Sequence, residues 1–206
     1  MSYLDQLFGL DGKVFIVTGS TSGLGKAMAE GLYRSGAKVV INGRSQERTE
    51  ACVNDIYSRG GQPGNLLAMK GDMSVLNDVE ALVQLTIAKF GKLDGIVNNA
   101  GINLPENSFT NHTLEDWNNI AGVNMTGPLN LTRVSLPFIK MSNAGRIINI
   151  SSIGGHVGLP QNVMYTVTKG GMRLFTKSLA AELAETSITV NSISPGVMIT
   201  PMNAKL

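Results

Sequence analysis

The sequence contains few cysteine, histidine and aromatic residues. Its 206 residues include one cysteine, Cys52, two histidines, His112 and His156, and 5% aromatic side chains. A single cysteine excludes an internal disulfide, and two histidines far apart give no recognisable set of metal ligands. We therefore expect a protein of a reducing compartment that holds no metal ion.

Excess charge and long apolar runs are also missing. Seventeen Lys and Arg against fifteen Asp and Glu leave a formal charge of +2, so the composition indicates no nucleic-acid partner. Two stretches without charged residues, 147–168 and 186–204, are interrupted by Asn, Ser, Gln and Pro, so we expect no membrane span. The length suits one ordinary domain, and we expect a single domain over residues 1–206.

The two ends of the sequence bear on the location of the protein. The amino terminus carries Asp5 before any basic residue and lacks the apolar block of a secretory signal, so we expect a cytoplasmic protein. The last three residues, Ala204, Lys205 and Leu206, resemble the Ser-Lys-Leu peroxisomal signal. A peroxisomal location is therefore the alternative, unless the tripeptide is accidental.

Short apolar runs alternate with helical patterns along the chain. Runs typical of buried strands cover residues 14–18, 38–42, 66–70, 93–97, 146–150 and 188–193. Helical spacing covers residues 24–35, 46–58, 75–90, 113–140 and 163–185, with a break or bend in the fourth segment near Pro128 and Pro137. This alternation predicts an α/β fold, in which helices cover both faces of a parallel sheet and ligands bind at the carboxyl ends of the strands.

A glycine-rich turn joins the first predicted strand to the helix that follows it. Glycines allow the backbone to approach a pyrophosphate closely, and the free amides at a helix start face the anion. The turn therefore predicts a dinucleotide site, and a turn without a ligand is the alternative. The residues expected to contact the cofactor here are Thr18, Gly19, Ser20, Ser22, Gly23, Leu24 and Gly25.

The second predicted strand ends without an acidic residue. A carboxylate at this point would bind the adenosine ribose of NAD. The sequence has Asn42, Gly43 and Arg44 instead, and the nearest acid, Glu47, lies beyond them. Because Arg44 offers a planar set of donors to a 2′-phosphate, we expect NADP(H) to be favoured over NAD(H). The alternative is that Arg44 is an ordinary solvated residue at a helix start.

Tyr165 and Lys169 lie four residues apart at the start of the last predicted helix, so their side chains share one helix face. A nearby cation stabilises the phenolate form of a tyrosine, which suits it to acid–base catalysis. Ser152, thirteen residues before Tyr165, ends the fifth strand and can donate to a carbonyl oxygen, whereas the adjacent Ser151 points to the opposite face. This set predicts proton transfer to an oxygen beside a hydride donor.

These motifs, together with those at residues 98–101, 124 and 195–200, resemble the short-chain dehydrogenase/reductase family over about residues 10 to 200. The resemblance favours the branch that includes 3-oxoacyl thioester reductases and sugar-acid dehydrogenases. It implies a Rossmann-like, doubly wound parallel sheet with the strand order 3-2-1-4-5-6. Family members normally continue past Thr200 through a helical lid and a final strand, so we expect both to be missing here.

The resemblance also implies the roles of individual residues. Tyr165 would be the general acid/base, Lys169 would tune it and hold the nicotinamide ribose, and Ser152 would position the reacting oxygen. Asn124 would maintain a water-linked proton path to Lys169, unless it only caps or kinks its helix. Cofactor contacts are implied for Tyr165 and Lys169 and for Asp72, Asn98, Ala100, Gly101, Pro195, Gly196 and Thr200.

The leading hypothesis is an NADP-dependent oxidoreductase that interconverts a ketone and a secondary alcohol. Its substrate would be a small carbonyl compound or alcohol, with 3-oxoacyl thioesters and sugar acids or polyols as candidates. We expect specificity to lie around residues 103–110 and 153–160. The resemblance implies a homo-oligomer, a dimer or tetramer, if the carboxyl-terminal end is present. The alternative is a non-catalytic short form that binds NADP or dimerises.

Overall fold

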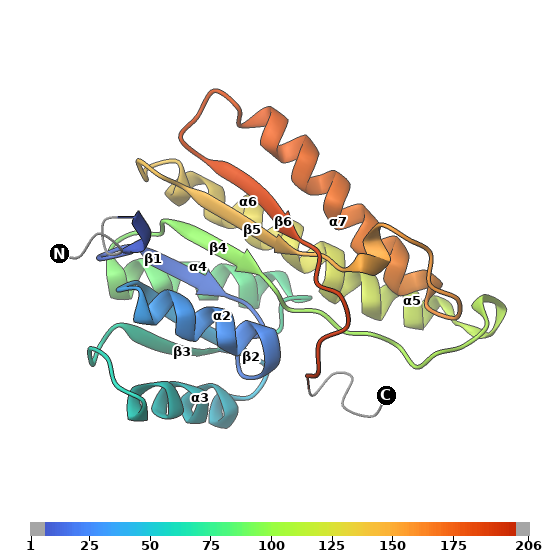
Figure 1. The fold of residues 1–206 in the computed structure, drawn as a ribbon, viewed down its shortest axis with the longest axis horizontal. Coiled ribbons are helices and arrows are strands. Elements are labelled where there is room, and N and C mark those ends of the chain that lie inside the picture. The colour runs from blue at the N-terminus through green and yellow to red at the C-terminus, as the bar shows by residue number, and fades with distance from the viewer. Residues whose placement is uncertain (1–6, 201–206) are drawn as a thin grey trace.

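The fold is built on a six-stranded parallel sheet, seen in a computed structural model that describes residues 7–200 (Figure 1). The strand order is β3-β2-β1-β4-β5-β6, as predicted, and each strand lies within two residues of its expected position. The strands are β1 (Val14–Val17), β2 (Lys38–Gly43), β3 (Leu66–Lys70), β4 (Gly95–Asn98), β5 (Arg146–Ile150) and β6 (Thr189–Ile193). The tripeptide at 204–206 lies outside the described residues.

Helices cover both faces of the sheet. The helices are α2 (Gly23–Arg34), α3 (Gln46–Ser58), α4 (Leu76–Phe90), α5 (Leu114–Ala121), α6 (Gly127–Ile139) and α7 (Val163–Glu182), the last ending three residues earlier than expected. Short 3-10 turns, η1 (Phe109–Asn111) and η3 (Ile153–Gly155), follow β4 and β5. Within residues 7–200, no helix is long and apolar enough to cross a membrane.

The alternation of side chains along β1 explains the two layers. Val14 and Ile16 belong to one buried cluster, with side chains of α4, α6 and α7. Phe15 and Val17 belong to a second cluster, with side chains of α2 and α3. Because both faces of the strand are buried, β1 is apolar at every position instead of alternating with polar residues.

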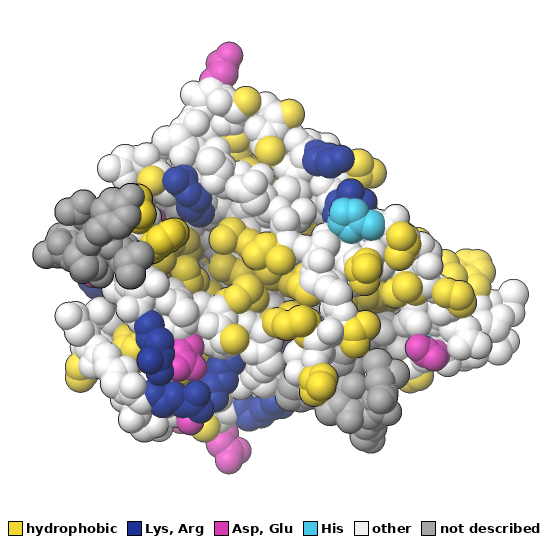
Figure 2. Space-filling view, in the orientation of Figure 1, with side chains coloured by type: hydrophobic (Ala, Val, Ile, Leu, Met, Phe, Trp, Pro, Cys, Tyr) yellow, Lys and Arg dark blue, Asp and Glu magenta, His cyan; other side chains and the backbone are white. Residues whose placement is uncertain are grey.

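The face of the molecule seen in Figure 2 differs between its two halves. Over α2 and α3, basic and acidic side chains are intermixed in Figure 2, and Lys26 pairs with Asp55 at 2.6 Å. Between α2 and β6, hydrophobic side chains are open to solvent in the same view. Ile193 of β6, which pairs with the buried Ile150 of β5, is 50% exposed.

The fourth predicted helical segment is interrupted at one of the two expected places. Thr113 and Asp116 form a reciprocal cap at the start of α5, as their spacing suggests. The interruption is a π turn, Gly122–Thr126, which ends before Pro128. Pro128 closely follows this turn, and its missing N–H falls within one continuous helical backbone, because the residues between α5 and α6 also have helical dihedral angles. α6 continues past Pro137 to Ile139. The interruption therefore lies near Pro128, as expected, and there is none at Pro137.

A buried carboxylate holds the amino-terminal edge of the sheet. Asp94 accepts hydrogen bonds from the Val14 amide at 2.9 Å and the Ser142 hydroxyl at 2.6 Å, and it pairs with Lys92 at 2.9 Å. Burial would raise the pKa of Asp94, but the bonds from Ser142, Lys92 and Val14 outweigh it and lower that pKa. Asp94 therefore joins β1, β4 and the segment after α6 at the edge opposite the carboxyl ends of the strands.

Candidate active site

Two adjoining cavities lie where the strands end. The first has a volume of about 200 Å³ and the second about 350 Å³, and Gly19 and Ser22 line both. Lining residues of the first include Gly101, Ser152, Tyr165, Lys169, Gly196 and Thr200. Lining residues of the second include Thr21, Asn42, Arg44, Arg48, Asp72 and Ala100. The glycine turn therefore lies between the expected catalytic residues and Arg44.

The glycine turn has a backbone that only glycine adopts readily. Gly19 and Gly23 have φ angles of +60° and +55°. A Cβ on Gly19 would lie 2.9 Å from the Ala100 Cα, and a Cβ on Gly25 would collide with the Asn99 side-chain amide. The N-cap residue Ser22 makes no side-chain hydrogen bond to the first turn of α2, so its amides are left to a ligand.

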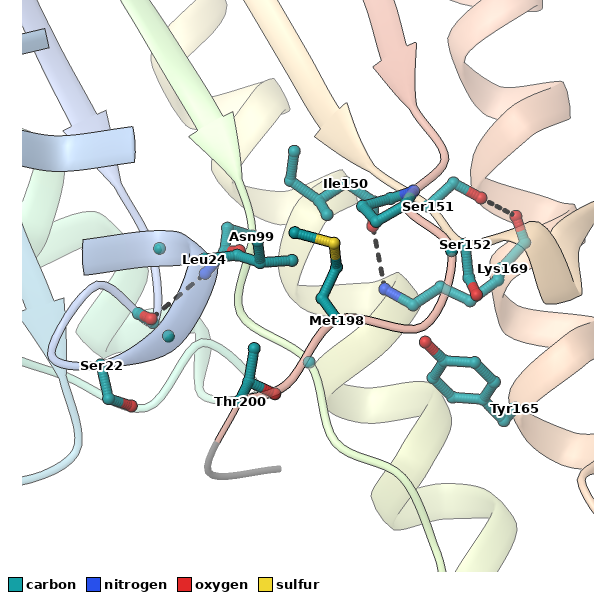
Figure 3. A pocket seen from close by; sticks show the side chains of 16 residues that line it. Ser22, Leu24, Asn99, Ile150, Ser151, Ser152, Tyr165, Lys169, Met198 and Thr200 are labelled. Carbon is teal, nitrogen blue, oxygen red and sulfur yellow. Dashed lines mark hydrogen bonds between the residues drawn. The ribbon is translucent and has the colours of Figure 1, made fainter. Parts of the chain in front are cut away.

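Tyr165 and Lys169 lie one helical turn apart on α7 and face the first cavity (Figure 3). The Lys169 ammonium is 5.7 Å from the centre of the Tyr165 ring and donates to the Ile150 carbonyl at 2.9 Å. Burial lowers the pKa of Lys169 to about 8, and no carboxylate of the described residues pairs with it. At neutral pH the ammonium therefore places a positive charge beside the phenol.

The two serines after β5 have different partners. The buried Ser151 hydroxyl donates to the Lys169 carbonyl at 2.8 Å, which fixes α7 against β5. The Ser152 hydroxyl oxygen accepts from the Gly154 amide at 3.1 Å. Since Ser152 uses its oxygen as an acceptor, its hydroxyl hydrogen can donate to a molecule in the first cavity. The expected role of Ser152 in positioning a reacting oxygen stays a prediction.

Asn124 lies in the π turn and is fully buried. Its Oδ1 accepts from the Ile102 amide at 2.8 Å, and its Nδ2 donates to the Ile102 carbonyl at 2.9 Å and the Thr168 hydroxyl at 3.2 Å. The side chain therefore joins other segments and does not cap its own helix. A Cβ on Gly101 would lie 3.4 Å from this Oδ1 and 3.5 Å from the Lys169 ammonium, so Gly101 leaves the space between the two groups open.

The second cavity contains two arginines with free side chains. Within residues 7–200, Arg44 and Arg48 make no side-chain hydrogen bond or ion pair. All five other arginines of the sequence are bonded in this way. Sequence reasoning missed Arg48, although its position one turn into the helix after Arg44 was a usable signal. Asp72 also lines this cavity, and its Oδ1 accepts from the Ser74 amide and hydroxyl.

Three expected cofactor contacts, Thr18, Ser20 and Asn98, line neither cavity. Thr18 is 2% exposed, and its hydroxyl oxygen accepts from the Asn99 and Ala100 amides. Ser20 is fully buried, and its hydroxyl donates to the Val17 carbonyl and accepts from the Asn42 amide, which joins β1 to β2. Asn98 is 3% exposed and donates to Asn149. Asn99 lines the first cavity. It belongs to the motif at residues 98–101 that was expected to border the cofactor cleft, although it was not among the expected cofactor contacts.

The segment after β6 completes the first cavity. The Pro195 carbonyl accepts from the Ile153 amide at 2.9 Å, which holds this segment beside η3. Figure 3 shows Met198 and Thr200 between Ser22, Leu24 and Asn99 on one side and Tyr165 and Lys169 on the other. Pro195, Gly196 and Thr200 therefore line the cavity as expected, together with Met198, which the sequence analysis did not select.

Comparison with known proteins decides the family. A sequence model described as short chain dehydrogenase matches residues 13–206. The chain belongs to the short-chain dehydrogenase/reductase family. Like other members of this family, it is an oxidoreductase that acts on small molecules with a nicotinamide cofactor.

Several family members are similar over nearly the whole chain. A 3-oxoacyl-[acyl-carrier-protein] reductase of Synechocystis is 36% identical over 198 residues, 96% of this chain and 78% of that protein. The reductase of the same name from Aquifex aeolicus is 40% identical over 200 residues, with the same coverage. The crystal structure of a 3-ketoacyl-(acyl-carrier-protein) reductase from Brucella melitensis complexed with NADH has a TM-score of 0.89 and 35% identity, covering 94% of this chain and 79% of that one.

The residues present fit the dinucleotide that the family uses. The glycine turn brings the backbone to the border of the two cavities, which suits a pyrophosphate. Arg44 and Arg48 suit the adenosine side, and Lys169 with Thr200 suits the nicotinamide side. The two cavities therefore provide one continuous path for an extended cofactor.

Proposed function

We propose that the protein is an NADP(H)-dependent oxidoreductase that interconverts a ketone and a secondary alcohol. The observation that carries this proposal is the buried Lys169 ammonium beside the Tyr165 phenol, in the cavity that adjoins the glycine turn. A bound nicotinamide supplies the hydride in reduction and accepts it in oxidation.

The protein's own residues would move the proton. In reduction, the Tyr165 hydroxyl donates its proton to the carbonyl oxygen, and the Lys169 ammonium stabilises the phenolate that is left. Ser152 donates a hydrogen bond to the same oxygen and holds it in place. Asn124 and the open space at Gly101 support a water-linked route that returns a proton to Lys169.

Two arginines support the preference for NADP(H). Arg44 and Arg48 have no anionic partner in the part of the chain that the structure describes, and the 2′-phosphate of NADP(H) would supply one. Guanidinium groups form strong, charge-assisted hydrogen bonds to phosphate oxygens. Asp72 is the one acidic residue among the described residues that line this cavity, and Ser74 occupies one of its oxygens. The cavity therefore offers a phosphate more donors than acceptors.

The relatives direct the choice of substrate. The two relatives named 3-oxoacyl-[acyl-carrier-protein] reductase, at 36% and 40% identity, support 3-oxoacyl thioesters as the first class. Sugar acids or polyols are the second class, supported by a Brucella melitensis structure titled glucose/ribitol dehydrogenase, with 31% identity and a TM-score of 0.89.

The test is NADPH oxidation with acetoacetyl thioester, a simple ketone and a keto sugar acid. We expect turnover of one of these by the wild type and a loss of at least about a hundredfold in Tyr165→Phe, with NADPH binding unchanged. Tyr33→Phe, which removes a phenol hydroxyl outside both cavities, is the matched control. A wild type that binds NADPH but turns over no substrate would instead support the non-catalytic alternative.

A further inference from the structure

The turn before α7 holds a strained residue. Gln161 has a φ angle of +60° and is the only non-glycine residue with a positive φ within residues 7–200. The Asn162 amide donates to the Leu159 carbonyl at 3.2 Å across this turn, with Pro160 before Gln161. That arrangement is typical of a type II turn, in which glycine is favoured at the position of Gln161. Such strain persists only where the surrounding structure holds it.

Three hydrogen bonds join this turn to the segment after β4. The Asn107 amide donates to the Gln161 carbonyl at 3.2 Å. Asn103 Nδ2 donates to Asn162 Oδ1 at 3.0 Å, and Asn162 Nδ2 donates to Glu106 Oε1 at 3.4 Å. We call these five residues the loop bridge. It holds the strained turn in place, and Asn162 supplies two of its three bonds.

Asn162 has an unusual role for a residue at the start of a helix. It is the N-cap residue of α7, a position at which asparagine commonly bonds the first-turn amides. Its side chain makes no such bond, and besides the loop bridge it donates only to the Pro160 carbonyl, at 3.3 Å. The side chain is therefore used to join two segments and not to cap the helix.

The loop bridge connects the two segments that leave the first cavity. One segment follows Gly101, and the other runs from Ser152 to the start of α7. A Cβ on Gly154 would lie 2.9 Å from Leu159 Cδ1, so the strained turn also packs closely on η3. Tyr165 lies in the first turn of α7, three residues after Asn162, where a helix frays most easily.

We propose that Asn162 is a positioning residue that acts on the reaction through Tyr165. By joining the segments after β4 and β5, it fixes the first turn of α7 and with it the direction of the Tyr165 phenol. The part of the proposal that concerns turnover rests on the proposed function, whereas the loop bridge itself does not.

The first test is kinetic and compares two variants. Asn162→Ala removes two bonds of the loop bridge, and we expect kcat to fall about tenfold to a hundredfold, as for a misplaced catalytic group, with KM for NADPH within about twofold. Asn162→Ser can cap α7 but cannot span the bridge, so we expect the same loss. Recovery of kcat in Asn162→Ser would show that only the helix cap matters and would overturn the proposal.

The second test exchanges donor and acceptor. Asn162→Asp alone places a carboxylate against Glu106, and we expect a loss of kcat similar to that of Asn162→Ala. Combining Asn162→Asp with Glu106→Gln lets the new amide donate to the new carboxylate, and we expect kcat to return to within about threefold of the wild type. A double variant as slow as Asn162→Asp contradicts the proposal.

The third test does not depend on turnover. We expect Asn162→Ala to speed hydrogen exchange at the Asn107 amide, which belongs to the other segment, by at least about tenfold. If the wild type reduces no ketone, the proposed function fails while this measurement still tests the bridge. Unchanged exchange at Asn107 would mean that Asn162 does not hold the two segments together.

Discussion

The side-chain amide of Asn124 pairs with the backbone of Ile102 in both directions, at 2.8 and 2.9 Å. Because the amide both donates and accepts, neither a carboxylate nor an apolar group can replace it. We predict that Asn124→Asp lowers the free energy of unfolding by about 2 kcal/mol and also reduces turnover. Urea unfolding checks the stability. Asn130→Asp, on the surface side of α6, is the control and should change stability by less than about 0.5 kcal/mol.

Gly101 should matter for turnover more than for stability. Its added Cβ would make ordinary contacts with Asn124 and Lys169, so we predict that Gly101→Ala folds with a free energy of unfolding within about 1 kcal/mol of the wild type. It would fill the space between the two groups and lower kcat about tenfold. Gly31→Ala, which meets nothing within 4 Å, should instead stabilise the protein by about 0.5–1 kcal/mol. Wild-type turnover in Gly101→Ala would show that this space is not used.

The pKa of Lys169 predicts a rise in stability with pH. Burial lowers this pKa to about 8, whereas the unfolded chain keeps the ordinary value near 10.5. Between these values the unfolded state binds more protons, so the free energy of unfolding should rise as the pH increases from 8 to 10. The rise should be at most about 3 kcal/mol and should be absent from Lys169→Met. Urea unfolding of both proteins at several pH values in this range tests the prediction. If the free energy of unfolding depends on pH in the same way in both, the prediction is wrong.

Arg44 and Arg48 should each discriminate between the two cofactors. We predict that Arg44→Ala and Arg48→Ala each weaken NADPH binding about tenfold or more, since each removes charge-assisted bonds, and change NADH binding less than about twofold. Fluorescence titration with both cofactors measures the dissociation constants. Arg133→Ala, on α6 and outside both cavities, is the control. Equal losses for NADPH and NADH would contradict the assignment.

Asp94 should support stability without affecting the chemistry. Its pKa is lowered in the folded state, so its contribution is present above a pH of about 4 and is lost as the pH falls through the folded pKa. We predict that Asp94→Asn lowers the free energy of unfolding by about 1–3 kcal/mol at neutral pH. As the pH falls below about 4, the free energy of unfolding should decrease less steeply in this variant than in the wild type. Turnover per folded molecule should be unchanged. A large fall in kcat would contradict the prediction, because it would show that Asp94 affects the reaction at the opposite edge of the sheet.

Most of the fold could be predicted from the sequence because it follows from local patterns. β3 and β5 have the predicted bounds, since their apolar runs end at polar or glycine residues. The π turn was not predictable in this way. Asn124 of this turn is held by the Ile102 backbone and Thr168, so the conformation of the π turn depends on contacts with distant segments. Pro128 indicated an interruption nearby, but it indicated neither the exact residues nor the π geometry.

The site could be predicted where its residues form motifs in the chain. Tyr165, Lys169 and Ser152 have the expected spacing and line one cavity. Within the motif at residues 98–101, Asn98 was selected as a cofactor contact and Asn99 was not, because which of the two side chains reaches the cavity depends on where the strand stops. The loop bridge was missed for another reason. Asn103 and Asn162 are 59 residues apart, and nothing in either local sequence indicates the contact.

The distance of Asp94 from the cavities has a practical consequence. Its hydrogen bonds lie at the amino ends of β1 and β4, whereas the glycine turn and Tyr165 lie at the opposite ends of the sheet. Substitutions that improve heat tolerance can therefore be sought at the amino ends of the strands, and substitutions that change ligand preference at their carboxyl ends. Engineering for robustness and engineering for selectivity become separate tasks in this scaffold.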